Sequence, residues 1–255
     1  MLSPMTEQPA RPEPLEPLNE DWQSALCIVA HPDDMEFGAA AAVARWTGQG
    51  KRVVYCMVTS GEAGIDGVTP EEAGPLREQE EIDSAQVVGV STVEFLRQPD
   101  GVLEYGVPLR RLFAQVVREH RPEIVITGNF KNTFGGRNLN QADHIAVGHA
   151  VLDAVRDAGN RWVFRDQVEG GLEPWGGVKE VWAAGSPDAE HGVDTTDSFD
   201  AGVESLAAHK AYIDGLGWEN WDPREFLEGF GRQTGQRLGV GMAAAFEVFP
   251  MGWGG

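Results

Sequence analysis

The chain has 255 residues, and its 42% apolar content is ordinary for a globular protein. Its 40 acidic residues outnumber its 20 basic residues, which gives a net charge of −20. A protein this acidic lacks the basic surface that binds nucleic acid or an anionic membrane, so both kinds of partner are excluded. No apolar run reaches the roughly 18 residues that a membrane span needs.

Residues 1–21 are rich in proline and glutamate and contain no apolar segment of the kind found in signal peptides. This composition predicts a disordered leader followed by one folded domain over residues 22–255. Cys27 and Cys56 fall on predicted central strands. Two buried thiols are most common in a reducing compartment, so we expect a cytoplasmic protein.

Short apolar runs alternate with segments of helical periodicity along most of the chain. This order predicts an α/β fold, a single Rossmann-like three-layer domain with a mainly parallel sheet and its site at the carboxyl edge of the strands. The aromatic residues of the tail, residues 218–255, predict either core packing or a subunit interface, the latter in a homo-oligomer, with a sugar-binding platform as the alternative. Strands are expected at 26–30, 52–59, 93–96, 123–127 and 178–184, and helices at 36–44, 70–88, 108–119, 144–152 and 198–213.

The segment His31-Pro32-Asp33-Asp34 directly follows the first predicted strand. Proline fixes its own φ and biases His31 away from helical geometry, so the strand ends in a stiff turn. One carboxylate of the pair can bind a cation while the other accepts a proton. The motif therefore indicates a metal site with a base beside it. The alternative is that Asp33 or Asp34 only caps the following helix.

A second histidine, His144, lies just before a segment with the apolar spacing of a helix, which places it in the first turn of that helix. If the preceding strand neighbours the first strand, His144 can converge with His31 and Asp34. Two imidazoles and one carboxylate with an open fourth position are typical of catalytic zinc, with iron or manganese as alternatives. His149 lies roughly 140° round the helix from His144 and is not expected to share the site. His120 and His191 are expected at the surface, His191 in a polar loop.

These segments resemble the LmbE-like, or PIG-L, family of zinc-dependent de-N-acetylases, and the likeness runs from about residue 25 to residue 215. The family signature is a strand followed by Ala-His-Pro-Asp-Asp, here residues 30–34, and a later His-Pro-Asp-His, here Gln141 to His144. The resemblance implies that His31, Asp34 and His144 are the metal ligands and that Asp33 is the general base.

Two further segments are similar to family motifs. Arg77 with Glu80 matches an Arg-x-x-Glu helix, and Asp100 belongs to a Pro-Asp-Gly loop. Because these positions contact the sugar in some members, the resemblance implies that Arg77 and Asp100 bind substrate. Without the resemblance, Arg77 would be expected to pair with Glu80 or Glu81 on a solvated helix face.

Gln141 departs from the family pattern, which has a histidine that steadies the oxyanion or protonates the leaving amine. A glutamine amide can donate a hydrogen bond but cannot act as an acid near neutral pH. The proton must then come from Asp33, returning what it took from water, or from His209. For His209 the alternative is a plain position on a helix surface.

The resemblance implies a hydrolase that removes an N-acyl group, most simply acetyl, from an amino sugar or its conjugate, so the partner is a small molecule. Two alternatives stay open. One is an amide hydrolase of the same fold acting on a thiol conjugate or a natural product. The other is a non-catalytic metal- or sugar-binding relative disabled by Gln141, although such a protein would have no need of Asp33.

Overall fold

The computed structural model describes residues 13–218 and 220–252. The strands are β1 (Glu16–Pro17), β2 (Ser24–Val29), β3 (Arg52–Met57), β4 (Val93–Phe95), β5 (Ile124–Gly128), β6 (Glu180–Ala184), β7 (His191–Asp194) and β8 (Ala243–Pro250). The helices are α1 (Asp34–Gly38), α2 (Ala40–Gly48), α3 (Pro70–Val87), α4 (Val107–His120), α5 (Ala142–Gly159), α6 (Arg165–Glu169), α7 (Phe199–Ala207), α8 (Lys210–Gly215) and α9 (Pro223–Leu238).

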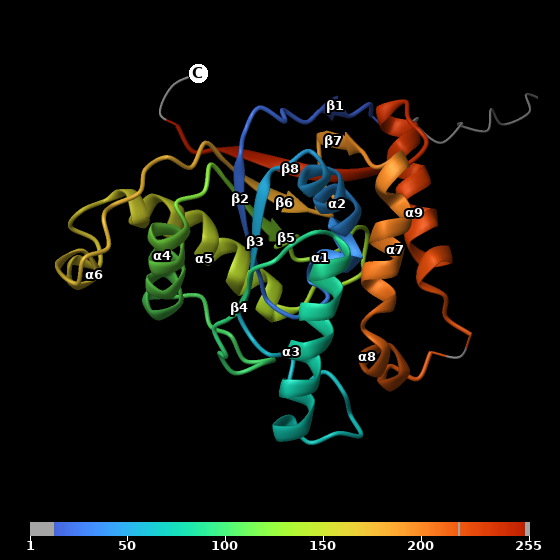
Figure 1. Ribbon diagram of the computed structural model, residues 1–255, viewed down its shortest axis with the longest axis horizontal. Helices are drawn as coiled ribbons and strands as arrows, with labels where there is room; N and C mark the ends of the chain where they lie inside the picture. Colours follow the sequence, from blue (N-terminus) through green and yellow to red (C-terminus); the bar gives the residue numbers. More distant parts are fainter. Residues whose placement is uncertain (1–12, 219, 253–255) are drawn as a thin grey trace, which may run out of the picture.

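The strands in the described part of the chain form one sheet in the order β1-β7-β8-β6-β5-β2-β3-β4 (Figure 1). Strand β8 runs antiparallel to β6 and β7. The remaining pairs are parallel. The predicted α/β fold with a mainly parallel sheet is therefore confirmed.

Helices cover both faces of the sheet and give it three layers (Figure 1). Strand β2 illustrates why its sequence is a continuous apolar run. Its residues Cys27 and Val29 face a core shared with α1, α2 and α3, whereas Leu26 and Ile28 face a second core shared with α4 and α5. A strand buried on both faces needs apolar side chains at every position.

The strand order places the site. From β2 the chain moves to β3 and β4 on one side, and it then returns to β5 and β6 on the other side. The direction of winding therefore reverses between β2 and β5, which pair in parallel. Loops leaving the carboxyl ends of two such strands diverge and leave a crevice, the usual ligand position in open α/β sheets.

The prediction of a disordered leader through residue 21 is wrong for residues 13–21. Strand β1 pairs in parallel with β7, and the side chains of Leu15 and Leu18 are buried. The high proline content gave no sign of these two apolar residues, which attach the segment to the rest of the domain. Residues 1–12 lie outside the described residues, so their disorder stays a prediction.

The C-terminal part differs most from the sequence prediction. The single helix expected over residues 198–213 is divided into α7 and α8 at Ala208 and His209. His191, expected in a loop, begins β7. The aromatic tail supplies α9 and β8, and Phe246 packs in the core, whereas Trp253 lies outside the described residues.

Among the described helices, none combines the length and apolarity required to cross a membrane.

Candidate metal and catalytic site

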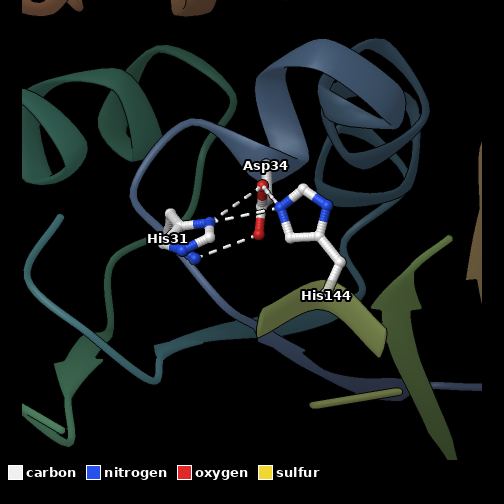
Figure 2. A group of neighbouring side chains, drawn as sticks. All are labelled: His31, Asp34 and His144. Atoms are coloured by element: carbon white, nitrogen blue, oxygen red, sulfur yellow. Dashed lines mark hydrogen bonds and ion pairs between the residues drawn. The ribbon is translucent and has the colours of Figure 1, made fainter. Parts of the chain in front are cut away.

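The turn after β2 and the first turn of α5 bring three side chains together (Figure 2). The Nε2 atom of His144 lies 3.0 Å from Oδ1 of Asp34 and 3.2 Å from Nδ1 of His31. One ligand-type atom from each residue lies within 4.8 Å of the others. The convergence predicted from β2 and β5 being neighbours is thus what the fold produces, because His31 and Asp34 follow β2 and His144 follows β5.

The outer nitrogen of each imidazole is held by a hydrogen-bond acceptor. His31 directs Nε2 to Oδ1 of Asp100 at 3.1 Å and to Oδ2 of Asp143 at 3.4 Å. His144 directs Nδ1 to Oδ1 of Asn140 at 2.9 Å. An imidazole that donates from its outer nitrogen turns a lone pair inward, so two lone pairs and a carboxylate face one another. That donor set fits a divalent metal ion and its supporting shell.

The charges around the ligands favour this arrangement. Burial lowers the pKa of His31, but the hydrogen bonds that its ring donates to the carboxylates of Asp100, Asp143 and Asp34 outweigh burial and raise this pKa well above its ordinary value. Burial alone would raise the pKa of Asp34, yet His144 and His31 hold it well below its ordinary value. The carboxylates of Asp34, Asp100 and Asp143 thus surround the two imidazoles with negative charge. This negative potential would attract a cation to the cluster.

Asp33 lies beside the ligands without belonging to them. Its carboxylate accepts a hydrogen bond from Nη2 of Arg77 at 2.7 Å, and both side chains are buried. Burial raises the pKa of Asp33 to about 6, against the opposing charge of Arg77. A carboxyl group with a pKa near the working pH can both take and return a proton. Asp33 precedes α1, but its side chain makes no capping hydrogen bond to that helix.

Arg77 and Asp100, predicted to bind substrate, both have protein partners. Arg77 is 2% exposed, and its guanidinium contacts the Asp33 carboxylate and the Pro32 carbonyl and lies 3.7 Å from the centre of the Tyr212 ring. Asp100 holds His31 and accepts a hydrogen bond from the amide of Ala63 at 2.9 Å. Both residues therefore position the site, and their contact with a sugar stays a prediction.

The structure separates the two residues considered as proton donors. Gln141 is exposed just before α5, three positions from His144, and its side chain makes no capping hydrogen bond. His209 is fully buried between Glu36 and Glu81, with Nε2 3.8 Å and 3.6 Å from their carboxylates. Burial and, to a lesser extent, the charge of nearby Arg77 lower the pKa of His209 to about 3. A lowered pKa favours the neutral imidazole, which donates protons poorly as a general acid. The role of His209 as the acid stays a prediction.

Sequence reasoning missed the residues that support the site. Asp143 stands inside the second motif, where it links His31 to the amides of Gly101 and Leu103 at 2.8 and 3.0 Å. Glu81 is buried and binds the amide of Asp33 at 3.1 Å. Glu81 lies four residues after Arg77 in the predicted helix, so both side chains must lie on one face of α3. This spacing could have indicated that Glu81 lies near the site.

Comparisons with known proteins agree with this geometry. The diacetylchitobiose deacetylase of Thermococcus kodakarensis is 29% identical over 238 residues, which cover 92% of this chain and 87% of that protein. A 1D-myo-inositol 2-acetamido-2-deoxy-alpha-D-glucopyranoside deacetylase of Kineococcus radiotolerans is 30% identical over 201 residues, covering 66% of this chain and 53%, about half, of that protein.

The fold is also found among solved structures. The N,N'-diacetylchitobiose deacetylase from Pyrococcus horikoshii, solved in complex with an inhibitor, superposes with a TM-score of 0.82 at 23% identity. The match covers 91% of this chain and 85% of that one.

A protein-family model covers the segment that holds the site. The model of PIG-L, described as GlcNAc-PI de-N-acetylase, matches residues 26–155. The matched half of the chain begins in β2 and ends in α5, so it includes both the turn with His31 and the helix with His144. The chain therefore belongs to the PIG-L family.

Proposed function

We propose that this protein is a zinc-dependent deacetylase that hydrolyses the N-acetyl group of a small amino sugar or amino-sugar conjugate. The observation that carries the proposal is the position of Asp33 next to the His31, Asp34 and His144 cluster, with Arg77 holding its carboxylate. Family membership and the deacetylase relatives support the same reaction.

His31, Asp34 and His144 would hold the metal ion, and three protein ligands leave a position open for substrate and water. When bound there, zinc would supply Lewis-acid chemistry, which activates water near neutral pH and polarises an acyl carbonyl. Iron and manganese suit the same donors.

Asp33 would accept the proton of the attacking water and then transfer it to the nitrogen of the leaving amine. The C–N bond breaks as that nitrogen is protonated, so one water and one amide give acetate and an amine. Arg77 would keep the Asp33 carboxylate directed at the reacting atoms. A buried carboxyl group with a pKa of about 6 suits both halves of this proton transfer.

Gln141 would donate a hydrogen bond from its exposed amide to the developing oxyanion, in the position where the family pattern has a histidine. A single donor of this kind is worth about 3 kcal/mol in the transition state.

The proposed cytoplasmic location is supported by the free thiols of Cys27 and Cys56, which are buried.

The test is amine release from a substrate panel by protein that has been stripped with a chelator and reloaded with zinc, manganese or ferrous iron. The panel contains N-acetylglucosamine, N,N'-diacetylchitobiose, an N-acetylglucosaminyl inositol and acetamides without a sugar. We expect release from at least one sugar, loss of activity after stripping, and recovery with zinc. Activity that survives stripping contradicts the metal, and release from the non-sugar amides alone contradicts the sugar.

A further inference from the structure

The residue assigned as general base has a rarely adopted backbone conformation. Asp33 has φ 100° and ψ −19°, on the left-handed side of φ/ψ space. Aspartate tolerates this side better than most residues, but its usual φ there is only about 57°. A conformation of this kind persists only where neighbouring groups hold it, and such positions cluster at active sites.

Three different parts of Asp33 are held. Its carbonyl accepts hydrogen bonds from the amides of Glu36 at 2.9 Å and Phe37 at 3.1 Å in the first turn of α1. Its carboxylate accepts from Arg77. Its own amide donates to Oε2 of Glu81 at 3.1 Å. The amide is therefore held by a side chain from another element, α3.

One face of α3 holds both ends of Asp33. Arg77 and Glu81 are four residues apart, so their side chains leave the same side of the helix. Arg77 contacts the carboxylate of Asp33, and Glu81 contacts its backbone amide. Because the direction of the Cα–Cβ bond depends on the backbone, holding the amide also determines where the carboxylate can point.

The surroundings of Glu81 indicate that the length of its side chain matters more than its charge for the hydrogen bond to Asp33. The residue is fully buried, next to Glu36 and His209. Burial and the Glu36 carboxylate raise the pKa of Glu81 well above its ordinary value, so its neutral form is favoured. A neutral carboxyl oxygen still accepts a hydrogen bond from an amide.

We propose that Glu81 is a positioning residue for deacetylation, which sets the direction of the Asp33 carboxylate by binding the backbone amide of Asp33. This inference rests on the proposed function. It adds a residue that touches neither substrate nor metal ligand and acts through the base.

Two substitutions in the zinc-loaded protein separate the effect of the length of the Glu81 side chain from the effect of its acid group. Glu81→Gln keeps an acceptor oxygen at the same distance and removes the acid, whereas Glu81→Asp keeps the acid and shortens the side chain by one methylene. We expect Glu81→Gln to retain kcat within about threefold. We expect Glu81→Asp to lower kcat by about 10- to 100-fold, since small displacements of a reacting group cost rates of this order, with KM and zinc content unchanged.

Amide hydrogen exchange at Asp33, measured by NMR, tests the contact without any need for activity. We expect slow exchange in the wild type and in Glu81→Gln and faster exchange in Glu81→Asp. The matched control is Ser84→Ala, which lies on the same helix and removes a buried hydrogen bond to Glu36 instead of one to Asp33. This variant should retain both kcat and slow exchange.

Three results would overturn the proposal: full activity in Glu81→Asp, a loss of kcat in Glu81→Gln of about 10-fold or more, or loss of zinc in parallel with activity. The second result would assign Glu81 to proton transfer, and it decides the question even if Glu81→Asp does not fold. If the wild type releases no amine from any sugar, the proposed function fails, and the exchange measurement still decides whether Glu81 holds Asp33.

Discussion

Asp33 and Asp34 are identical neighbours whose carboxyl groups are shifted in opposite directions. Burial raises the pKa of Asp33 to about 6, whereas the two imidazoles hold the pKa of Asp34 well below its ordinary value. The turn between β2 and α1 points one side chain at Arg77 and the other at His144. These different environments support the proposed roles, proton transfer for Asp33 and metal binding for Asp34.

The first prediction separates these roles by substitution. Asp33→Asn keeps the shape of the side chain but cannot accept a proton, so we expect kcat to fall by at least about 100-fold while zinc stays bound. His144→Ala removes a ligand, so we expect both zinc and activity to be lost. Amine release and the zinc content of the purified proteins measure the two effects.

The control for His144→Ala is His149→Ala, which removes an exposed histidine from the same helix. It should bind zinc and turn over substrate as the wild type does. Wild-type activity in Asp33→Asn would remove the base assignment, and full zinc content in His144→Ala would remove the ligand assignment.

A second prediction concerns pH and the buried Glu36. Burial raises the pKa of Glu36 to about 7 from an ordinary value of 4.5. The folded state then keeps a proton that the unfolded state releases, so this group's stabilisation is complete below pH 4.5 and is lost as the pH rises through 7. Glu36→Gln cannot ionise and escapes this loss.

Relative to the wild type, metal-free Glu36→Gln should therefore gain up to about 3 kcal/mol in free energy of unfolding between pH 4.5 and pH 7, the linkage value of such a shift. Denaturant unfolding at a series of pH values measures this gain. The exposed Glu72→Gln should show none. A difference between Glu36→Gln and wild type that does not change with pH would contradict the assignment.

At the scale of elements, the loop after β3 helps to place Arg77. A Cβ atom added at Gly64 would lie 2.4 Å from Nη1 of Arg77, whereas one added at Gly67 would meet nothing within 4 Å. Because the clash falls on the end of a long, flexible side chain, the Arg77 guanidinium would move and the loop backbone would stay in place. The displaced guanidinium would then lose its contact with Asp33.

We therefore expect Gly64→Ala to lower kcat by about 10-fold with zinc content unchanged, and Gly67→Ala to behave as the wild type. Steady-state kinetics on both zinc-loaded variants measures the difference. Equal kcat values for the two variants would show that the loop does not control Arg77.

The sequence was sufficient for the elements whose own residues specify them. Strands β2 and β3 are continuous apolar runs, and α3 begins at Pro70 with acidic residues in its first turn. The convergence of His31 with His144 followed from the single condition that their strands are neighbours. Local pattern and strand adjacency were thus enough to place the proposed ligands.

The sequence was not sufficient where a partner elsewhere in the chain decides the outcome. Strand β1 is two residues long and exists because β7 pairs with it. His209 looks like a surface residue of an alanine-rich helix, yet the break between α7 and α8 buries it beside Glu81. Neither contact has a local signature, because each depends on a residue far away in the sequence.

At the scale of the whole molecule, the net charge of −20 should influence which substrates react well. A strongly negative protein repels anionic ligands over a distance that salt shortens. We expect kcat/KM for a neutral N-acetylated sugar to be nearly constant between about 20 and 300 mM salt, while that for an acidic analogue rises with salt. Kinetics with a matched neutral and carboxylated sugar test this, and a falling value for the acidic analogue would indicate a local basic pocket.

Strand β1 also has a consequence for how the protein behaves at high concentration. It occupies one border of the sheet, and Pro17, with no N–H group to offer, interrupts the border that β1 itself exposes. An unprotected sheet border recruits strands from other molecules and leads to aggregation. Proteolytic removal of residues 13–21 would expose the edge of β7 and the apolar surface that Leu15 and Leu18 cover, so we expect the truncated protein to aggregate.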